Sequence, residues 1–211
     1  MRNHRRSDGL GYRALKPCYP WIGVDPGSTS GALVVLSPDG RSVVMWMAYT
    51  KVKSGIRATD WHGGKGVCGG LCPAIRGIAG WVLEDVSGYR LAVEGLYVPV
   101  ASQKRKATRV NVAAMVPLYE SAGMWLAFLL AGQVGEPWRP QAKAWRMRQL
   151  GVSQKIGRKA LDEASVQGAL RTLRWPKTLG LTALTVEERI AVCDAAWIAR
   201  DGWSMQGRVN G

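Results

Sequence analysis

Apolar runs bounded by turn residues predict several strands in the first half of the chain. Apolar residues fill Trp21–Asp25 and residues 32–36, and a third run follows over residues 42–49 after the turn Pro38-Asp39-Gly40. Short apolar runs between Gly, Pro and Asp residues are typical of buried strands. We expect these three runs to form an antiparallel meander, and residues 90–97 to form a fourth strand.

The second half of the chain has a helical period. We expect helices over residues 73–86, 108–131, 141–150, 158–173 and 185–200. Pro117 should kink the second helix or split it in two. Thr185 and Glu188 form a capping box at the start of the last helix, and Gly202 follows its expected end.

Two further segments complete the predicted fold. Residues 136–139 form a candidate short fifth strand, and residues 50–72, rich in Gly and Lys, are expected to be a long surface loop. The order of elements predicts an α/β domain with a central mixed five-stranded sheet flanked by helices.

The length of 211 residues suits one domain. We expect a basic, flexible N-terminal arm over residues 1–19, a domain over 20–204 and a C-terminal tail over 205–211. Apolar runs shorter than the roughly 18–20 residues of a membrane span, and an N-terminus without an apolar segment, predict a soluble, cytoplasmic protein with no membrane partner.

Positive charge is the first indication of function. Lys and Arg number 29 against 15 Asp and Glu, a net charge of +14. Residues 139–159 hold seven Lys or Arg and no acid, and residues 104–109 hold four and no acid. Positive charge could serve solubility alone, but its clustering favours a polyanionic partner such as nucleic acid.

Three acids occur in unusually apolar surroundings. Asp25 closes an apolar run, Glu94 lies within Leu91-Ala92-Val93-Glu94-Gly95-Leu96, and Asp194 lies on an apolar face of the last helix. Buried carboxylates are costly unless they are paired or bound to metal. Each acid alone has another explanation: a turn at Asp25, an arginine partner for Glu94, a solvent-facing position for Asp194. Together they predict a site for hard divalent cations.

Glycines and cysteines add smaller signals. Gly27 suits a tight turn with positive φ, and Gly31 would let backbone or a phosphate come close. His62, Cys68 and Cys72 lie near one another, but their spacing is poor for zinc, so we favour reduced, unligated thiols.

An ordered set of motifs over roughly residues 21–200 resembles the RuvC-type Holliday junction resolvases of the RNase H-like superfamily. The motifs are Ile22-Gly23-Val24-Asp25-Pro26-Gly27 with Gly31, Ala92-Val93-Glu94, Asn111-Val112-Ala113-Ala114, Pro140-Gln141-Ala142-Lys143 and Cys193-Asp194-Ala195-Ala196-Trp197-Ile198-Ala199. The resemblance implies an RNase H-like fold and a homodimer that nicks four-way DNA junctions during recombination and repair. It also implies Mg²⁺ or Mn²⁺, two ions per active site, and no nucleotide cofactor.

Carried onto this chain, the resemblance makes Asp25, Glu94 and Asp194 the catalytic metal ligands. A fourth ligand usually lies three residues before the last Asp, where this sequence has Ala191. Glu187, one heptad before Asp194 and on the same helix face, is the candidate substitute. Glu188 and Asp201 are weaker candidates, since Glu188 also serves the capping box.

The resemblance also implies DNA contacts. The basic loop after the second catalytic strand should probe the junction through Gln103, Lys104, Arg105, Lys106 and, at the start of the following helix, Arg109. Lys143 and one of Lys155 and Lys159 should support the transition state near the cleaved phosphate, although plain backbone contacts would equally explain their charge.

In the expected reaction, a metal-bound water attacks the phosphodiester while a second ion stabilises the leaving oxygen. Residues 111–131 would form the dimer interface or, alternatively, central core.

Other RNase H-like nucleases, which act on flaps or RNA–DNA hybrids, remain an alternative interpretation of the sequence. So does a non-catalytic junction-binding protein, because of Ala191. A sugar-kinase or actin-like ATPase is disfavoured by length and charge.

Overall fold

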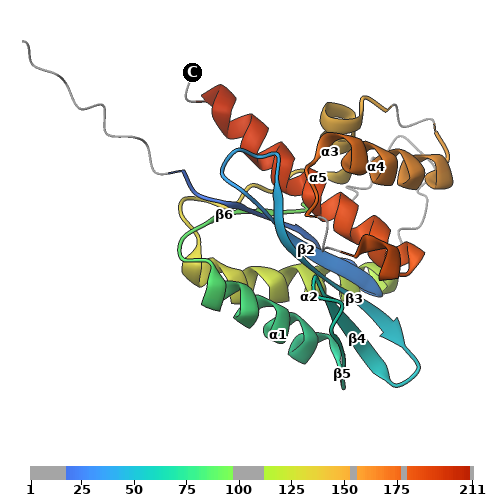
Figure 1. The fold of residues 1–211 in the computed structure, drawn as a ribbon. Helices are drawn as coiled ribbons and strands as arrows, with labels where there is room; N and C mark the ends of the chain where they lie inside the picture. The colour runs from blue at the N-terminus through green and yellow to red at the C-terminus, as the bar shows by residue number, and fades with distance from the viewer. Residues whose placement is uncertain (1–17, 97–111, 153–155, 177–179, 210–211) are drawn as a thin grey trace, which may run out of the picture.

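The computed structural model describes residues 18–96, 112–152, 156–176 and 180–209. In these residues a six-stranded mixed sheet lies between two layers of helices (Figure 1). The strands are β1 Trp21–Asp25, β2 Ser30–Leu36, β3 Val43–Val52, β4 Gly55–Asp60, β5 Lys65–Cys68 and β6 Arg90–Val93. Their order is β5-β4-β3-β2-β1-β6, with β1 and β6 parallel and all other neighbours antiparallel.

The predicted mixed α/β class and the β1–β2–β3 meander are confirmed, but the strand count of five is wrong. Residues 50–72, expected to be a loop, contain the end of β3, all of β4 and β5, and the start of α1. Their glycines and lysines hide the alternation that marks a strand, because only Ile56 and Thr59 of β4 are fully buried. Residues 136–139 form no strand and make only an isolated bridge from Trp138 to Ala92.

Each expected helix is present, with altered ends. The helices are α1 Leu71–Asp85, α2 Val112–Leu129, α3 Ala142–Leu150, α4 Arg158–Thr172 and α5 Val186–Val209, with 3₁₀ turns at Leu130–Gly132 and Leu181–Ala183. The capping box is confirmed: the backbone N–H of Glu188 donates to Thr185 Oγ1 at 3.2 Å, and the N–H of Thr185 donates to Glu188 Oε2 at 3.0 Å.

Two expectations about helix breaks are corrected. α2 runs through Pro117 as one helix and is not split there. α5 continues past Gly202 to Val209, so it enters the segment expected to be a tail. Gly202 serves packing and does not end the helix, because a Cβ atom there would lie 2.4 Å from the ring of Trp21.

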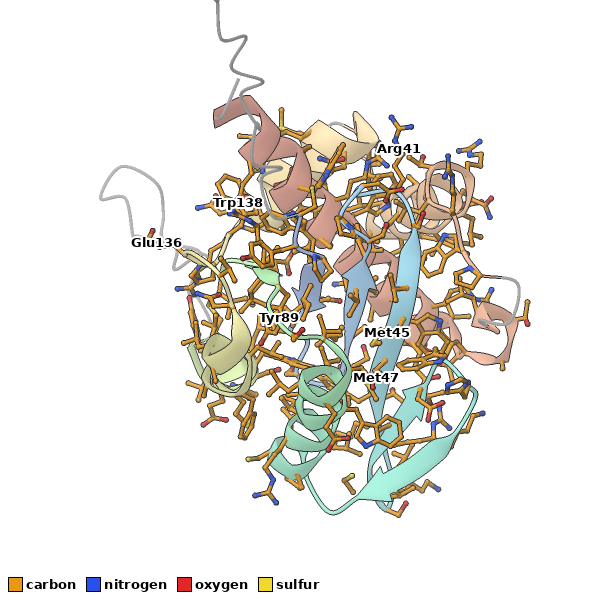
Figure 2. The ribbon with its side chains drawn as sticks, turned by 60° about the vertical axis from the view of Figure 1, so that its left-hand side comes forward. Arg41, Met45, Met47, Tyr89, Glu136 and Trp138 are labelled. Atoms are coloured by element: carbon orange, nitrogen blue, oxygen red, sulfur yellow. The ribbon has the colours of Figure 1, made fainter. Side chains whose placement is uncertain are left out.

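The two faces of the sheet bury separate cores. One face packs against α5 with α3 and α4, and includes Trp46, Trp145 and Trp197. The other packs against α1 and α2 and includes Met45, Met47 and Tyr89, which Figure 2 labels. α5 can cross β1 closely because Gly23 has no side chain: a Cβ there would lie 2.0 Å from the carbonyl oxygen of Ala195. This close crossing places the middle of α5 over the end of β1.

α2 is the most apolar helix of the described chain. By length and composition alone, residues Met115–Gly132 could cross a membrane. In this fold the helix packs against α1, and its Trp125 and Leu129 are fully buried in the second core. Val116 and Leu130 remain nearly half exposed, so part of its apolar surface has no covering within the described residues.

Candidate active site

Asp25 and Glu94 come together because their strands are parallel neighbours. β1 and β6 pair with Val24 opposite Val93, and the backbone N–H of Glu94 donates to the carbonyl oxygen of Val24 at 3.1 Å. Asp25 is the last residue of β1, and Glu94 directly follows β6. The two acids therefore lie side by side at the carboxyl ends of adjacent strands.

Asp194 reaches the same place from α5. It directly precedes Ala195, whose backbone lies against Gly23 two residues before Asp25. Asp25, Glu94 and Asp194 all line one pocket of about 770 Å³. The structure thus brings together three acids that are far apart in the sequence. We call this hollow the carboxylate pocket.

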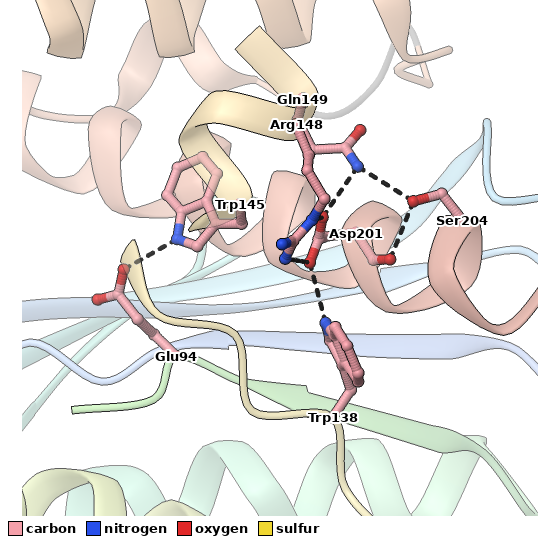
Figure 3. Close-up of polar contacts among 7 residues, drawn as sticks. All are labelled: Glu94, Trp138, Trp145, Arg148, Gln149, Asp201 and Ser204. Atoms are coloured by element: carbon pink, nitrogen blue, oxygen red, sulfur yellow. Dashed lines mark hydrogen bonds and ion pairs between the residues drawn. The ribbon is translucent and has the colours of Figure 1, made fainter. Parts of the chain in front are cut away.

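α3 supplies the partners of two of these acids. Trp145 Nε1 donates to Glu94 Oε1 at 2.9 Å, as Figure 3 shows. Arg146 Nη2 donates to Asp194 Oδ2 at 3.0 Å and forms an ion pair with it. The hydroxyl of Ser165, in α4, donates to the other oxygen of Asp194. Arg146 is therefore the resident cation that touches the acidic cluster.

The three carboxyl groups disfavour one another's charge. Burial raises the pKa of Asp25 well above its ordinary value, and repulsion from Glu94 and then Asp194 raises it further. Burial is also the main cause of the raised pKa values of Glu94 and Asp194. Burial opposes the charge of Arg146, but attraction to Asp194 and Glu94 outweighs it and raises the pKa of that guanidinium. The pocket holds more negative charge than Arg146 balances.

The chemistry of these donors fits a hard divalent cation, since Mg²⁺ and Mn²⁺ prefer carboxylate oxygens. The side chains as placed form no closed group: in the described part of the chain, no three or more His, Cys, Asp or Glu side chains surround one point as a metal site would. Oxygens of Glu94 and Asp194 accept hydrogen bonds instead, from Trp145, Arg146 and Ser165. Cys68 and Cys72 are free thiols.

The position of the fourth ligand is occupied by Ala191, which is buried at the pocket wall. Glu187, the predicted substitute, is exposed and lines the same pocket. Asp162 of α4, which the sequence did not single out, also lines it and raises the pKa of Asp194. Asp162 lies 3.7 Å from Arg158 in an exposed ion pair. Two carboxylates, Glu187 and Asp162, thus line the same pocket as Ala191.

The weaker candidates Glu188 and Asp201 have structural roles. Glu188 is 1% exposed, completes the capping box and pairs with Arg57 at 3.1 Å. Asp201 is fully buried and accepts hydrogen bonds from Arg148, Trp138 and Gln149, at 2.6–3.1 Å (Figure 3). Burial alone would raise the pKa of Asp201, but these hydrogen bonds outweigh it and lower the pKa. Asp201 therefore ties α5 to α3.

Only some of the residues predicted to contact DNA are among the described residues. Gln103, Lys104, Arg105, Lys106, Arg109 and Lys155 lie outside the described residues. Lys143 and Lys159 are exposed on α3 and α4. Lys159 lines a second hollow of about 590 Å³, which adjoins the carboxylate pocket through the shared residues Arg158 and Asp162. Neither lysine lines the carboxylate pocket itself, whose basic residues are Arg146 and Arg158.

The loop after Asp25 differs from expectation at one glycine. Gly27 does not have positive φ. A larger residue is excluded at position 27, because a Cβ there would lie 1.7 Å from the carbonyl oxygen of Ser30. The hydroxyls of Tyr49 and Ser121 both donate to the carbonyl oxygen of Gly27, which fixes the loop beside Asp25. Gly31 does permit close approach of backbone, because its Cβ would lie 2.7 Å from the carbonyl oxygen of Asp25.

Sequence reasoning missed Trp145, Arg146, Asp162 and Ser165. A Trp-Arg pair in a basic stretch was available as a signal, but nothing local shows that its partners are Glu94 and Asp194, about 50 residues away in the chain.

No protein-family model matches this chain, and no curated protein sequence matches it. The fold and site therefore define the class only as a mixed α/β domain with an acidic pocket at the carboxyl ends of β1 and β6.

Proposed function

We propose that this protein is a structure-selective DNA endonuclease that cleaves four-way junctions by metal-dependent phosphodiester hydrolysis. The observation that carries the proposal is the convergence of Asp25, Glu94 and Asp194, from β1, the end of β6 and α5, on one pocket. Burial, and at Asp25 repulsion from its acidic neighbours, raises the pKa values of these carboxyl groups, and bound divalent cations would stabilise their charged forms. The strongly basic chain supplies affinity for a polyanion.

In this proposal Asp25, Glu94 and Asp194 hold Mg²⁺ or Mn²⁺, with two ions per site. The bound cations would supply an activated water and stabilise the leaving oxygen. Trp145 orients Glu94 by its hydrogen bond, and Ser165 orients Asp194. Tyr49 and Ser121 hold the loop beside Asp25. These contacts fix the carboxylates before substrate binds, which is the preorganisation that catalysis requires.

Arg146 has two roles in this proposal. Without cations it balances part of the charge of the acidic cluster through Asp194. Its guanidinium lines the carboxylate pocket and its side chain is 27% exposed, so it can also meet a phosphate oxygen bound in that pocket. An arginine can bind phosphate through two parallel hydrogen bonds, which would place the phosphodiester beside the carboxylates.

The RNase H-like fold, the four-way junction and the homodimer rest on the motif resemblance. The six-stranded mixed sheet flanked by helices is compatible with such a fold. The half-exposed Val116 on α2 and Leu130 in the 3₁₀ turn after it support a second copy as a partner. A homodimer would bring two sites to the two strands of a symmetric junction. Sedimentation equilibrium of the wild-type protein and of Leu130→Glu tests the dimer. The wild type should have the molar mass of a dimer, and the variant that of a monomer.

Cleavage of matched labelled substrates tests the proposal. A synthetic four-way junction, a flap, a linear duplex and an RNA–DNA hybrid are incubated with Mg²⁺, Mn²⁺ or EDTA. We expect cation-dependent nicking of the junction in preference to the others, and none with Asp25→Asn. Unchanged cleavage by Asp25→Asn would remove the catalytic assignment, and preference for the flap or the hybrid would point to another RNase H-like nuclease.

A non-catalytic junction-binding protein is the second candidate. The Arg146–Asp194 ion pair and Ala191 favour it, because an arginine in place of cations could keep the acidic cluster folded without metal. Isothermal titration with Mn²⁺ separates the two. Stoichiometric Mn²⁺ binding that is lost in Asp25→Asn supports the nuclease, and junction binding without Mn²⁺ binding supports the non-catalytic protein.

A further inference from the structure

The β3–β4 hairpin extends the sheet beyond the carboxylate pocket. Thr50 of β3 pairs with Ser30, and the backbone N–H of Lys51 donates to the carbonyl oxygen of Thr29 at 2.7 Å. β3 is antiparallel to β2, so its last residues return to the edge where β1 ends at Asp25. The hairpin therefore begins beside the loop that follows the first catalytic acid.

A shallow hollow of about 410 Å³ lies at this hairpin. The hydroxyl residues Thr29, Thr50 and Thr185 line it together with Lys51 and Arg57. It shares Thr29, Ser30 and Glu187 with the carboxylate pocket, so the two hollows are continuous. A chain bound across the acids would pass directly into this hollow, which offers hydroxyl and cationic groups.

The charged residues near the turn of the hairpin are all cationic. Residues 50–59 contain Lys51, Lys53 and Arg57 and no acid. Arg57 is already paired with Glu188. Lys51 and Lys53 are exposed, and neither has an ion-pair partner within the described part of the chain. Glu187 is the acid that faces the hollow. Lys51 therefore lines the hairpin hollow, and Lys53 lies two residues further on, in the turn between β3 and β4.

Cations also line a second hollow that adjoins the carboxylate pocket. This hollow, lined by Arg158, Lys159 and Arg189, shares Arg158 and Asp162 with that pocket. Both hollows adjoin the carboxylate pocket: the second hollow holds Asp162 and Glu163 beside its three cations, and the hairpin hollow holds Glu187 beside Lys51 and Arg57. A phosphodiester chain suits this arrangement, because successive phosphates can meet the cations of the adjoining hollows while one phosphate lies at the acids.

We propose that the β3–β4 hairpin binds backbone phosphates of DNA through Lys51 and Lys53, beside the wall that its hollow shares with the carboxylate pocket. This inference rests on the proposed nuclease function and adds to it the direction of the bound strand. Because phosphate contacts carry no base information, the hairpin contributes affinity and register without sequence preference.

The test compares two double variants that lose the same charge. Lys51→Ala/Lys53→Ala removes the hairpin lysines. The control, Lys65→Ala/Arg76→Ala, removes exposed cations from β5, at the far end of β4 from the hairpin turn, and from α1, on the opposite face of the sheet. Binding of a fluorescein-labelled four-way junction is measured by anisotropy in EDTA at several KCl concentrations, and single-turnover cleavage is measured with Mg²⁺ at saturating protein.

For the hairpin variant, we expect the slope of log K against log[KCl] to become shallower by about 2, at roughly 0.9 per phosphate contact, with an affinity loss on the order of tenfold at 0.1 M KCl. The control should keep the wild-type slope, and the hairpin variant should keep the wild-type cleavage rate at saturation. A hairpin variant with the slope of the control overturns this inference alone, while wild-type cleavage upholds the nuclease. A wild-type protein that neither binds nor cleaves the junction overturns both.

Discussion

Replacing Arg146 by methionine removes the guanidinium that pairs with Asp194 and keeps a side chain of similar length. The Asp194 side chain is 8% exposed and that of Arg146 is 27% exposed, so the lost pair is largely buried. Breaking a buried pair by removing one partner costs about 3–5 kcal/mol, because the other charge is left uncompensated. Partial exposure of Arg146 and the hydrogen bond from Ser165 to Asp194 place the expected cost at the lower end, about 3 kcal/mol at pH 8.

The pH dependence of this loss has a definite sign. Burial raises the pKa of Asp194, and Arg146 lowers it, so Arg146→Met moves that pKa further upward. A raised carboxyl pKa in the folded state lowers stability as pH increases above the ordinary value near 4. The variant should therefore lose most stability at pH 8 and progressively less toward pH 4, where Asp194 is protonated in both proteins.

Urea unfolding at pH 8 and pH 5 in EDTA measures the effect, with Arg158→Met as the matched control. Arg158 lines the same pocket, but its side chain is 92% exposed and lies 3.7 Å from Asp162, so its loss should cost under about 0.5 kcal/mol. The double variant Arg146→Met/Asp194→Asn should recover most of the loss. An Arg146→Met variant no less stable than the control, or equally weakened at both pH values, would refute the role of Arg146 as counter-ion.

Three further substitutions test the site and its supports. Asp25→Asn should stabilise the protein at pH 8 in EDTA by about 1 kcal/mol or more, since burial and repulsion raise the Asp25 pKa; urea unfolding checks this, and a less stable variant would contradict the repulsion. Asp201→Asn should cost about 3 kcal/mol of stability at pH 7, because it removes the carboxylate that pairs with Arg148. Because the pKa of Asp201 is lowered in the folded protein, the stability that its carboxylate contributes should decrease as the pH falls. Equal losses at pH 7 and pH 3 would argue against this role of Asp201. Gly23→Ala should lower the thermal midpoint by several degrees, through a clash with Ala195 that costs about 3 kcal/mol, whereas Gly66→Ala, with open space around it, should change the midpoint little.

Local patterns were sufficient for most elements of the fold. The apolar runs at β1 to β3 and the helical periods of α1 to α5 follow from which residues must be buried, and burial repeats with the period of each element. β4 and β5 escaped detection because they lie toward the edge of the sheet, where β5 has largely exposed residues and no alternation. Gly202 was misread for a related reason: a glycine marks either a helix end or a close approach, and only the position of Trp21 separates the two.

The sequence by itself determined that Asp25, Glu94 and Asp194 lie in apolar surroundings, and hence that they need partners. Only the tertiary structure decided what the partners of Glu94 and Asp194 are: Trp145 and Arg146 from α3, and Ser165 from α4. The physical reason is that burial is encoded in each residue's own neighbours along the chain, whereas an ion pair between Arg146 and Asp194 depends on how α3 and α5 pack. Convergence is set by strand pairing and by the helix crossing at Gly23, neither of which has a local signal.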